Sequence, residues 1–138
     1  MIDIHSKLPA QGVTIFSVMT AMAHRLNALN LSQGFPDFAA PPALLKALSQ
    51  ATLDGFNQYA PSDGLISLRE QLAHQFLKRD QLVIDPITEI TITPGATIGI
   101  FCTIQALIHA GDEVIIFDPC YDSYGPSVQL VGAEAIHI

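Results

Sequence analysis

The 138-residue sequence carries little positive charge and few cysteines. The chain has six lysine and arginine residues and thirteen aspartate and glutamate residues, so the net charge is −7. No basic run occurs, which argues against nucleic-acid binding, because such binding needs clustered lysine or arginine side chains against the phosphates. The two cysteines, Cys102 and Cys120, give no sign of the disulfide framework of a small secreted domain.

Long apolar runs and targeting segments are also missing. No run reaches the roughly 18 to 20 apolar residues of a transmembrane helix, and the first ten residues lack the apolar core of a signal peptide. We therefore expect a cytoplasmic protein without a membrane segment. The five histidines show no metal-binding spacing, and neither H-E-x-x-H nor C-x-x-C occurs, so no metal site is expected.

Charge of either sign is scarce. Hydrophobic residues make up 49% of the chain and charged residues 14%, whereas about 25% charged residues is usual in soluble domains. A small domain standing alone has too little interior to bury so much apolar surface. The composition therefore indicates that partner surface is missing from this chain.

The order of the expected elements predicts an α/β fold. Helical spacing of apolar residues occurs in segments 14–26, 43–53, 65–78, 96–109 and 127–131. Short apolar or β-branched runs typical of strands occur at 89–93, 113–117 and 133–138. The resulting β–α–β–α–β order predicts a parallel, helix-covered sheet. Ligands of such sheets bind at the carboxyl ends of the strands.

The segment around Gly95 is the first candidate site. An expected strand stops at Pro94, and Gly95 allows a tight turn directly into a helix. The first amides of that helix, with the Thr97 hydroxyl, would face an anion such as a phosphate. The same residues also suit ordinary turn chemistry. Neither the Walker loop nor the G-x-G-x-x-G fingerprint is present.

Two loops rich in turn-forming residues are further candidate sites. Residues 30–38 are rich in turn residues and aromatic rings, and residues 57–64 place Tyr59 among turn residues. Tyr59 is either a surface aromatic residue or a ligand contact.

Four segments taken together resemble a known family. They are residues 30–38, 57–59, 93–97 and 111–124, and they include the runs Q-G-F-P-D-F and D-P-C-Y-D-S-Y. In this order and spacing they resemble the amino-terminal part of class I/II, fold type I, pyridoxal-phosphate-dependent aminotransferases. The resemblance is to the branch that contains methionine, kynurenine and glutamine/phenylpyruvate aminotransferases, and it extends from about residue 8 to residue 138.

The resemblance implies a fold and a division of the chain. Residues 1–40 would form an amino-terminal arm, a helix and a substrate loop. Residues 41–138 would form the first part of the cofactor-binding large domain, a three-layer α/β structure with a mainly parallel sheet that is incomplete in this chain. The implied activity is transfer of an amino group between an amino acid and a 2-oxo acid through a pyridoxal phosphate Schiff base.

The resemblance also assigns cofactor-binding residues. Gly95, with the Ala96 and Thr97 amides, would hold the phosphate of pyridoxal phosphate. Tyr121 would stack on the pyridine ring. Tyr59 would cross a homodimer interface and donate a hydrogen bond to the phosphate in the partner's site.

Two further residues are implied to serve the substrate. Gly34 would offer its backbone to the substrate carboxylate, and Phe16 would line the substrate pocket of the partner subunit. Phe16 and the Gly-Phe-Pro-Asp-Phe loop suggest an apolar pocket suited to methionine, aromatic amino acids or glutamine.

The family's Schiff-base lysine has no counterpart here. The three lysines are Lys7, Lys46 and Lys78, and none of them matches the family's motif. In the family this lysine, the carboxylate on the pyridinium nitrogen and the arginine for the substrate all come after the segment that this chain matches. We therefore expect a fragment, about the first third of the enzyme, that is inactive alone. A non-catalytic remnant of a cofactor site, or an interaction module, is the alternative.

Overall fold

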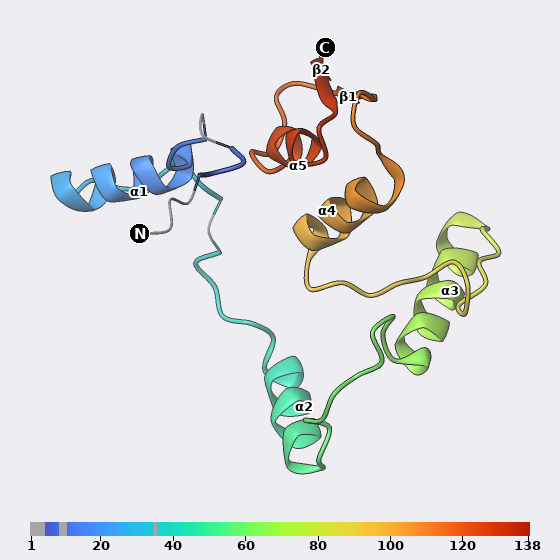
Figure 1. Ribbon diagram of the computed structural model, residues 1–138. Coiled ribbons are helices and arrows are strands. Elements are labelled where there is room, and N and C mark those ends of the chain that lie inside the picture. The colour runs from blue at the N-terminus through green and yellow to red at the C-terminus, as the bar shows by residue number, and fades with distance from the viewer. Residues whose placement is uncertain (1–4, 9–10, 35) are drawn as a thin grey trace, which may run out of the picture. The chain divides into compact units, whose positions relative to one another are not determined.

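The computed structural model describes residues 5–8, 11–34 and 36–138. These residues form two compact units, one from the described residues up to 34 together with 95–138, and the other from residues 36–94. Their elements follow in the order α1 (Ile15–Leu26), α2 (Pro42–Leu53), α3 (Ile66–Asp80), α4 (Ala96–Leu107), β1 (Glu113–Ile116), α5 (Tyr124–Leu130) and β2 (Glu134–His137) (Figure 1). Within the described part of the chain, no helix has the length and apolar character needed to cross a membrane.

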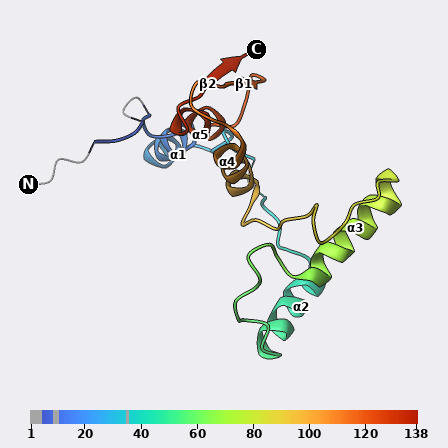
Figure 2. The ribbon, with the colours of Figure 1, turned by 45° about the vertical axis from the view of Figure 1, so that its right-hand side comes forward.

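A parallel strand pair is the centre of the first unit. β1 and β2 run in the same direction, with Glu113 opposite Glu134 and Ile116 opposite His137. Helix α5 connects the two strands and lies beside them in both views (Figures 1 and 2). Val128 of α5 is fully buried and packs with Ile116 in a small core. This β–α–β unit confirms the expected α/β class and the parallel direction of these two strands.

The helix expected at 14–26 is confirmed as α1. Thr14 caps it, because its side-chain oxygen accepts a hydrogen bond from the Ser17 amide at 3.3 Å. Asn27 ends it in the left-handed region, at φ 49°, where asparagine is one of the residues that are tolerated.

The strand expected at 89–93 is wrong. The described residues of this segment form no strand, and β1 and β2 are the one strand pair among the described residues. The Ile92 amide donates instead to the Asp63 carbonyl oxygen at 3.0 Å. β-branched residues favour a pleated surface only when a neighbouring strand supplies the ladder, and among residues 5–8, 11–34 and 36–138 no strand pairs with this segment.

A buried arginine organises the second unit. Arg69 of α3 is 6% exposed, and its Nη1 lies 2.9 Å from the Asp63 carboxylate and 3.3 Å from the Ile87 carbonyl oxygen. Its buried Nε atom has no hydrogen-bond partner among the described residues. One guanidinium therefore joins the loop before α3, the helix itself and the segment that leads to Ile92.

Gly64 makes this arrangement possible. Its φ is +97°, and an added Cβ would lie 2.6 Å from the Cβ of Ile92 and would collide with the Ile92 Cγ1 atom. Both the backbone conformation and the space beside it therefore require glycine.

We predict that Gly64→Ala loosens this contact. Strain and overpacking of this kind cost about 1–3 kcal/mol, so the Ile92 amide should exchange with solvent at least about tenfold faster. Hydrogen exchange measured by mass spectrometry on peptides spanning Ile92 checks this. Gly55→Ala is the matched control, because Gly55 also has a positive φ, +92°, but has nothing within 4 Å of an added Cβ. Equal effects of the two variants would contradict the steric argument.

Much apolar surface remains uncovered. Ile115 is 62% exposed and Phe117 75% exposed, beside an open apolar hollow of about 360 Å³. Three apolar side chains, Ile116, Val128 and Ala133, are buried among the described residues. Exposed apolar patches of this kind mark surfaces that other protein normally covers, as the low charge of the sequence indicates.

We predict that the purified 138-residue chain self-associates, since burying the side chains around this hollow is favourable at about 25 cal/mol per Å². Sedimentation velocity should show dimers or larger species, and Phe117→Asp should shift the distribution toward monomer. Val83→Asp is the control, because Val83 is 87% exposed and does not line the hollow. A stable monomer that unfolds cooperatively would contradict this prediction.

Candidate functional site

The start of α4 is the candidate phosphate site. Gly95 precedes the helix with φ 89°, and α4 begins at Ala96 with no acidic residue in its first turn. The first four amides of any α-helix have no partner within the helix, so the Ala96 and Thr97 amides point out of its amino terminus. A Cβ on Gly95 would meet nothing within 4 Å, which leaves room for a ligand to approach the backbone. The helix start at Ala96 confirms the expected turn.

Tyr121 follows the carboxyl end of β1 and belongs to an aromatic cluster. Its ring centroid lies 6.1 Å from that of Phe16 in a stacked arrangement and 6.1 Å from that of Tyr124 in a tilted one. The Tyr121 side chain is 49% exposed, so part of its surface is available to another planar group. α1 supplies Phe16 to this cluster. Phe16 thus contacts Tyr121 of its own chain, while its expected role in a partner's pocket stays a prediction.

The loop that carries Gly34 is attached to α1. Thr20 donates to the Gln33 side chain at 3.4 Å and accepts from the Asn30 side chain at 3.2 Å. Gly34 is exposed, and a Cβ there would meet nothing within 4 Å, so its backbone is accessible. Phe35 of the expected apolar pocket lies outside the described residues.

Tyr59 is assigned separately from the other candidate residues. It belongs to the second unit, and its side chain is completely exposed. The structure thus places Phe16, Gly34, the turn at 95–97 and Tyr121 in one unit and Tyr59 in the other. The expected approach of Thr97 and Tyr121 to one ligand stays a prediction.

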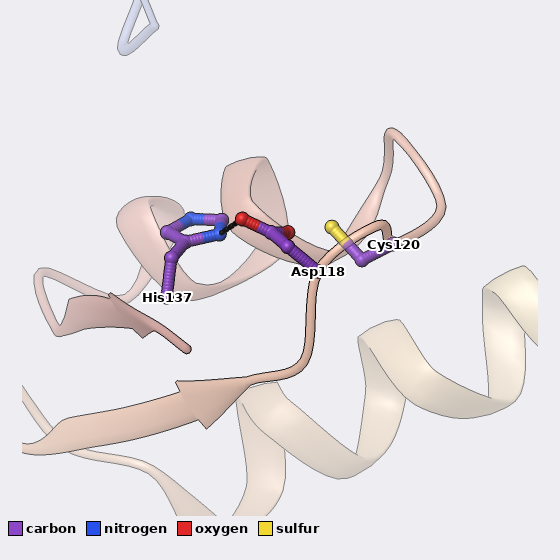
Figure 3. Close-up of side chains that lie close together, drawn as sticks. All are labelled: Asp118, Cys120 and His137. Atoms are coloured by element: carbon purple, nitrogen blue, oxygen red, sulfur yellow. Dashed lines mark hydrogen bonds and ion pairs between the residues drawn. The ribbon is translucent and has the colours of Figure 1, made fainter.

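Sequence reasoning missed a cluster of three polar side chains formed by Asp118, Cys120 and His137. The Asp118 carboxylate lies 3.0 Å from Nδ1 of His137, and Cys120 lies on its other side (Figure 3). The hydrogen bond from His137, followed by that from Cys120, lowers the pKa of Asp118. Loss of hydration, and then the hydrogen bond and charge of Asp118, raises the pKa of the Cys120 thiol.

One signal in the sequence could have located this cluster. Asp118 and His137 both stand near the carboxyl ends of runs expected to be strands of one parallel sheet, and such ends meet at one edge of a sheet. The pairing of Asp63 with Arg69 had no comparable signal, because it depends on the path of the loop before α3.

Comparison with known proteins identifies the family of the chain. The family model for aminotransferase class I and II matches residues 27–138. The chain belongs to the class I and II aminotransferase family. It is 47% identical over 127 residues to methionine aminotransferase of Escherichia coli K12, covering 92% of this chain and 33% of that protein. It is 42% identical over 120 residues to human kynurenine–oxoglutarate transaminase 3, covering 86% of this chain and 26% of that protein.

A solved structure shows the same likeness in three dimensions. The crystal structure of an Escherichia coli protein with a methionine aminotransferase function superposes with a TM-score of 0.93 at 43% identity. The match covers all of this chain and 36% of that one. The chain therefore spans about a quarter to a third of the length of the relatives it matches. The fold is a partial α/β structure of the aminotransferase type, with a short parallel sheet.

Proposed function

We propose that this chain forms the amino-terminal part of a pyridoxal-phosphate-dependent aminotransferase, which moves an amino group between an amino acid and a 2-oxo acid. The observation that carries the proposal is the family match over residues 27–138. The helix-start turn at Gly95 and the exposed ring of Tyr121 lie within the matched segment. Both have the chemistry that a phosphorylated aromatic cofactor needs.

The residues present fit such a cofactor. The Ala96 and Thr97 amides, with the Thr97 hydroxyl, would donate hydrogen bonds to a phosphate dianion at the positive end of α4. Tyr121 would cover one face of the pyridine ring and exclude water from it. When bound, the cofactor supplies an aldehyde that reacts with the substrate amine and a ring that accepts electrons.

The chain's own residues would bind and orient the cofactor and the substrate and would not react with them. Lys7 lies in the arm, Lys46 in α2 and Lys78 in α3, and none of them matches the family's Schiff-base motif. We therefore expect the chain to be inactive without a lysine supplied by further sequence. Gly34 would present its backbone to the substrate carboxylate, and the enzyme would be a homodimer in which Tyr59 and Phe16 serve the partner's site. The complete exposure of Tyr59 is in keeping with that role.

The substrate class that we propose is apolar or aromatic: methionine, aromatic amino acids or glutamine. The relatives reported above act on methionine and kynurenine by their names, and the chain offers Phe16 and the loop at Gly34 to a substrate side chain. A rate comparison in which aspartate is preferred to all of these would contradict this choice.

The alternative function is a non-catalytic interaction module. The exposed apolar side chains around Phe117 favour it, because they would suit a partner as well as the remainder of an enzyme. The two functions differ in one observable: only an aminotransferase segment should support catalysis when the remaining two thirds of an aminotransferase are supplied.

A chimera tests this difference. Residues 1–138 replace the matching segment of Escherichia coli methionine aminotransferase, and transamination of methionine is followed with pyridoxal phosphate present. We expect an active, cofactor-loaded chimera and no activity from the 138-residue chain alone. A folded chimera without cofactor would contradict the proposal, and so would transamination by the chain alone.

We predict that Tyr121→Ala in this chimera weakens cofactor affinity by about 1 kcal/mol, the scale of an aromatic contact beyond area burial, or about fivefold in Kd. Tyr121→Phe is the control, since it keeps the ring and should retain affinity. Fluorescence titration of the cofactor-free chimera measures both variants. Unchanged affinity in Tyr121→Ala would exclude stacking.

Tyr59→Phe should weaken cofactor affinity only in the dimer, because the Tyr59 hydroxyl serves the partner's site.

A further inference from the structure

The side chains of Asp118, Cys120 and His137, here called the Asp118–Cys120–His137 cluster, lie close together near the carboxyl ends of β1 and β2 (Figure 3). One ligand-type atom from each residue lies within 4.8 Å of the other two. The residues are separated by up to 19 positions in sequence, so it is the parallel pairing of β1 with β2 that brings them together.

The backbone fixes two of the three positions. His137 pairs with Ile116 in the strand register, and the Ile138 amide donates to the Ile116 carbonyl oxygen at 3.0 Å. The Asp118 amide donates to the Ile138 carbonyl oxygen at 2.9 Å. Both residues are therefore held by hydrogen bonds that continue the ladder beyond the strand ends, and Cys120 follows Asp118 by two residues.

The orientation of the imidazole suits coordination through Nδ1. This atom faces Asp118 at 3.0 Å, while a Cβ on Gly125 would lie 4.0 Å from Nε2, so the second nitrogen faces the first turn of α5. The side chains of His137 and Asp118 are 46% and 51% exposed, which leaves them free to adjust and gives an ion a path from solvent.

The donor set has the composition of a transition-metal site. Thiolate, imidazole and carboxylate are the three ligand types that bind Zn²⁺, at about 2.3, 2.0–2.1 and 2.0–2.2 Å. Around a tetrahedral ion such atoms lie about 3.3–3.6 Å apart. Here Nδ1 and the carboxylate oxygen are slightly closer than that, and the whole set falls within 4.8 Å. Movements of about an ångström or less in these exposed side chains would bring the three ligand atoms to the separations found around a tetrahedral ion.

We propose that the Asp118–Cys120–His137 cluster binds a divalent transition-metal ion of the zinc class, with water at the fourth position. Binding replaces the hydrogen bonds within the cluster. The thiol proton leaves to solvent, and a neutral imidazole that is protonated on Nδ1 shifts that proton to Nε2, so that Nδ1 can coordinate the ion. Carboxylate and thiolate then balance the two positive charges of the ion. The cluster shares no residue with the candidate phosphate site at Gly95, and it adjoins Tyr121 in sequence.

Cobalt titration of the 138-residue chain tests the proposal. Co²⁺ bound to this donor set should give visible bands of tetrahedral intensity and a near-ultraviolet thiolate-to-cobalt band, saturating at one ion per chain. Zn²⁺ should displace Co²⁺ and abolish both, because zinc binds such sites more tightly. Titration without saturation, or bands of octahedral intensity, would overturn the proposal and indicate only weak binding to surface carboxylates.

The chain provides matched controls. Cys120→Ser should abolish the thiolate band, whereas Cys102→Ser should keep it, because Cys102 is not part of the cluster. Cys102 is a fair control, since both cysteines are exposed. His137→Asn and Asp118→Asn should each weaken binding at least about tenfold. His109→Asn should have no effect, although Nδ1 of His109 also lies near a carboxylate, 3.7 Å from Asp112, because the cluster does not include it. A thiolate band that survives in Cys120→Ser would refute the assignment.

Alkylation gives a second readout that does not depend on spectra or on the oligomeric state. Zn²⁺ should slow the reaction of Cys120 with iodoacetamide at least about tenfold and leave Cys102 unaffected, as measured by peptide mass spectrometry, and a chelator should reverse the protection. Circular dichroism before and after addition checks that the fold is unchanged. Equal protection of both cysteines, or of neither, would exclude the site.

Discussion

The parallel ladder between β1 and β2 is the constraint on which the first unit depends. It fixes Ile116 opposite His137, and it allows α5 to bury Val128 against the strands. It also decides where Tyr121 and Asp118 emerge, because both follow the end of β1. A slip of one residue in this register would turn every strand side chain to the opposite face. The core, the aromatic cluster and the polar cluster therefore share one set of backbone hydrogen bonds.

Local signals in the sequence were sufficient for most helices and for the paired strands. Thr14 and Pro42 mark the beginnings of α1 and α2, and the apolar run before Asp118 marks β1. The segment at 89–93 shows the limit of such signals. Its β-branched residues are compatible with a strand, but strand formation depends on a neighbour that lies elsewhere in a chain, and local sequence does not reveal whether that neighbour is present.

The residues of the candidate site also differ in whether local sequence could locate them. Gly95 and Tyr121 could be found because each follows a strand-like run and suits a known chemistry at that place. Tyr59 could be named only through family resemblance, since a tyrosine in a turn-rich loop is ordinary by itself. The contact of Phe16 with Tyr121 could not be predicted, because it depends on how α1 packs in three dimensions. Burial of Arg69 was equally hidden, because arginine is normally an exposed residue.

The attachment of Ile92 to the loop before α3 has a consequence for loop length. Surface loops usually accept insertions, and residues 57–62 lie in an exposed loop. At Asp63 and Gly64 the same loop has no such freedom, because the Asp63 carbonyl holds Ile92, its carboxylate holds Arg69, and Gly64 leaves no space beside Ile92. Natural variation in length should therefore occur on the Tyr59 side of Asp63, and Asp63 and Gly64 should keep their sequence spacing from α3, which begins at Ile66.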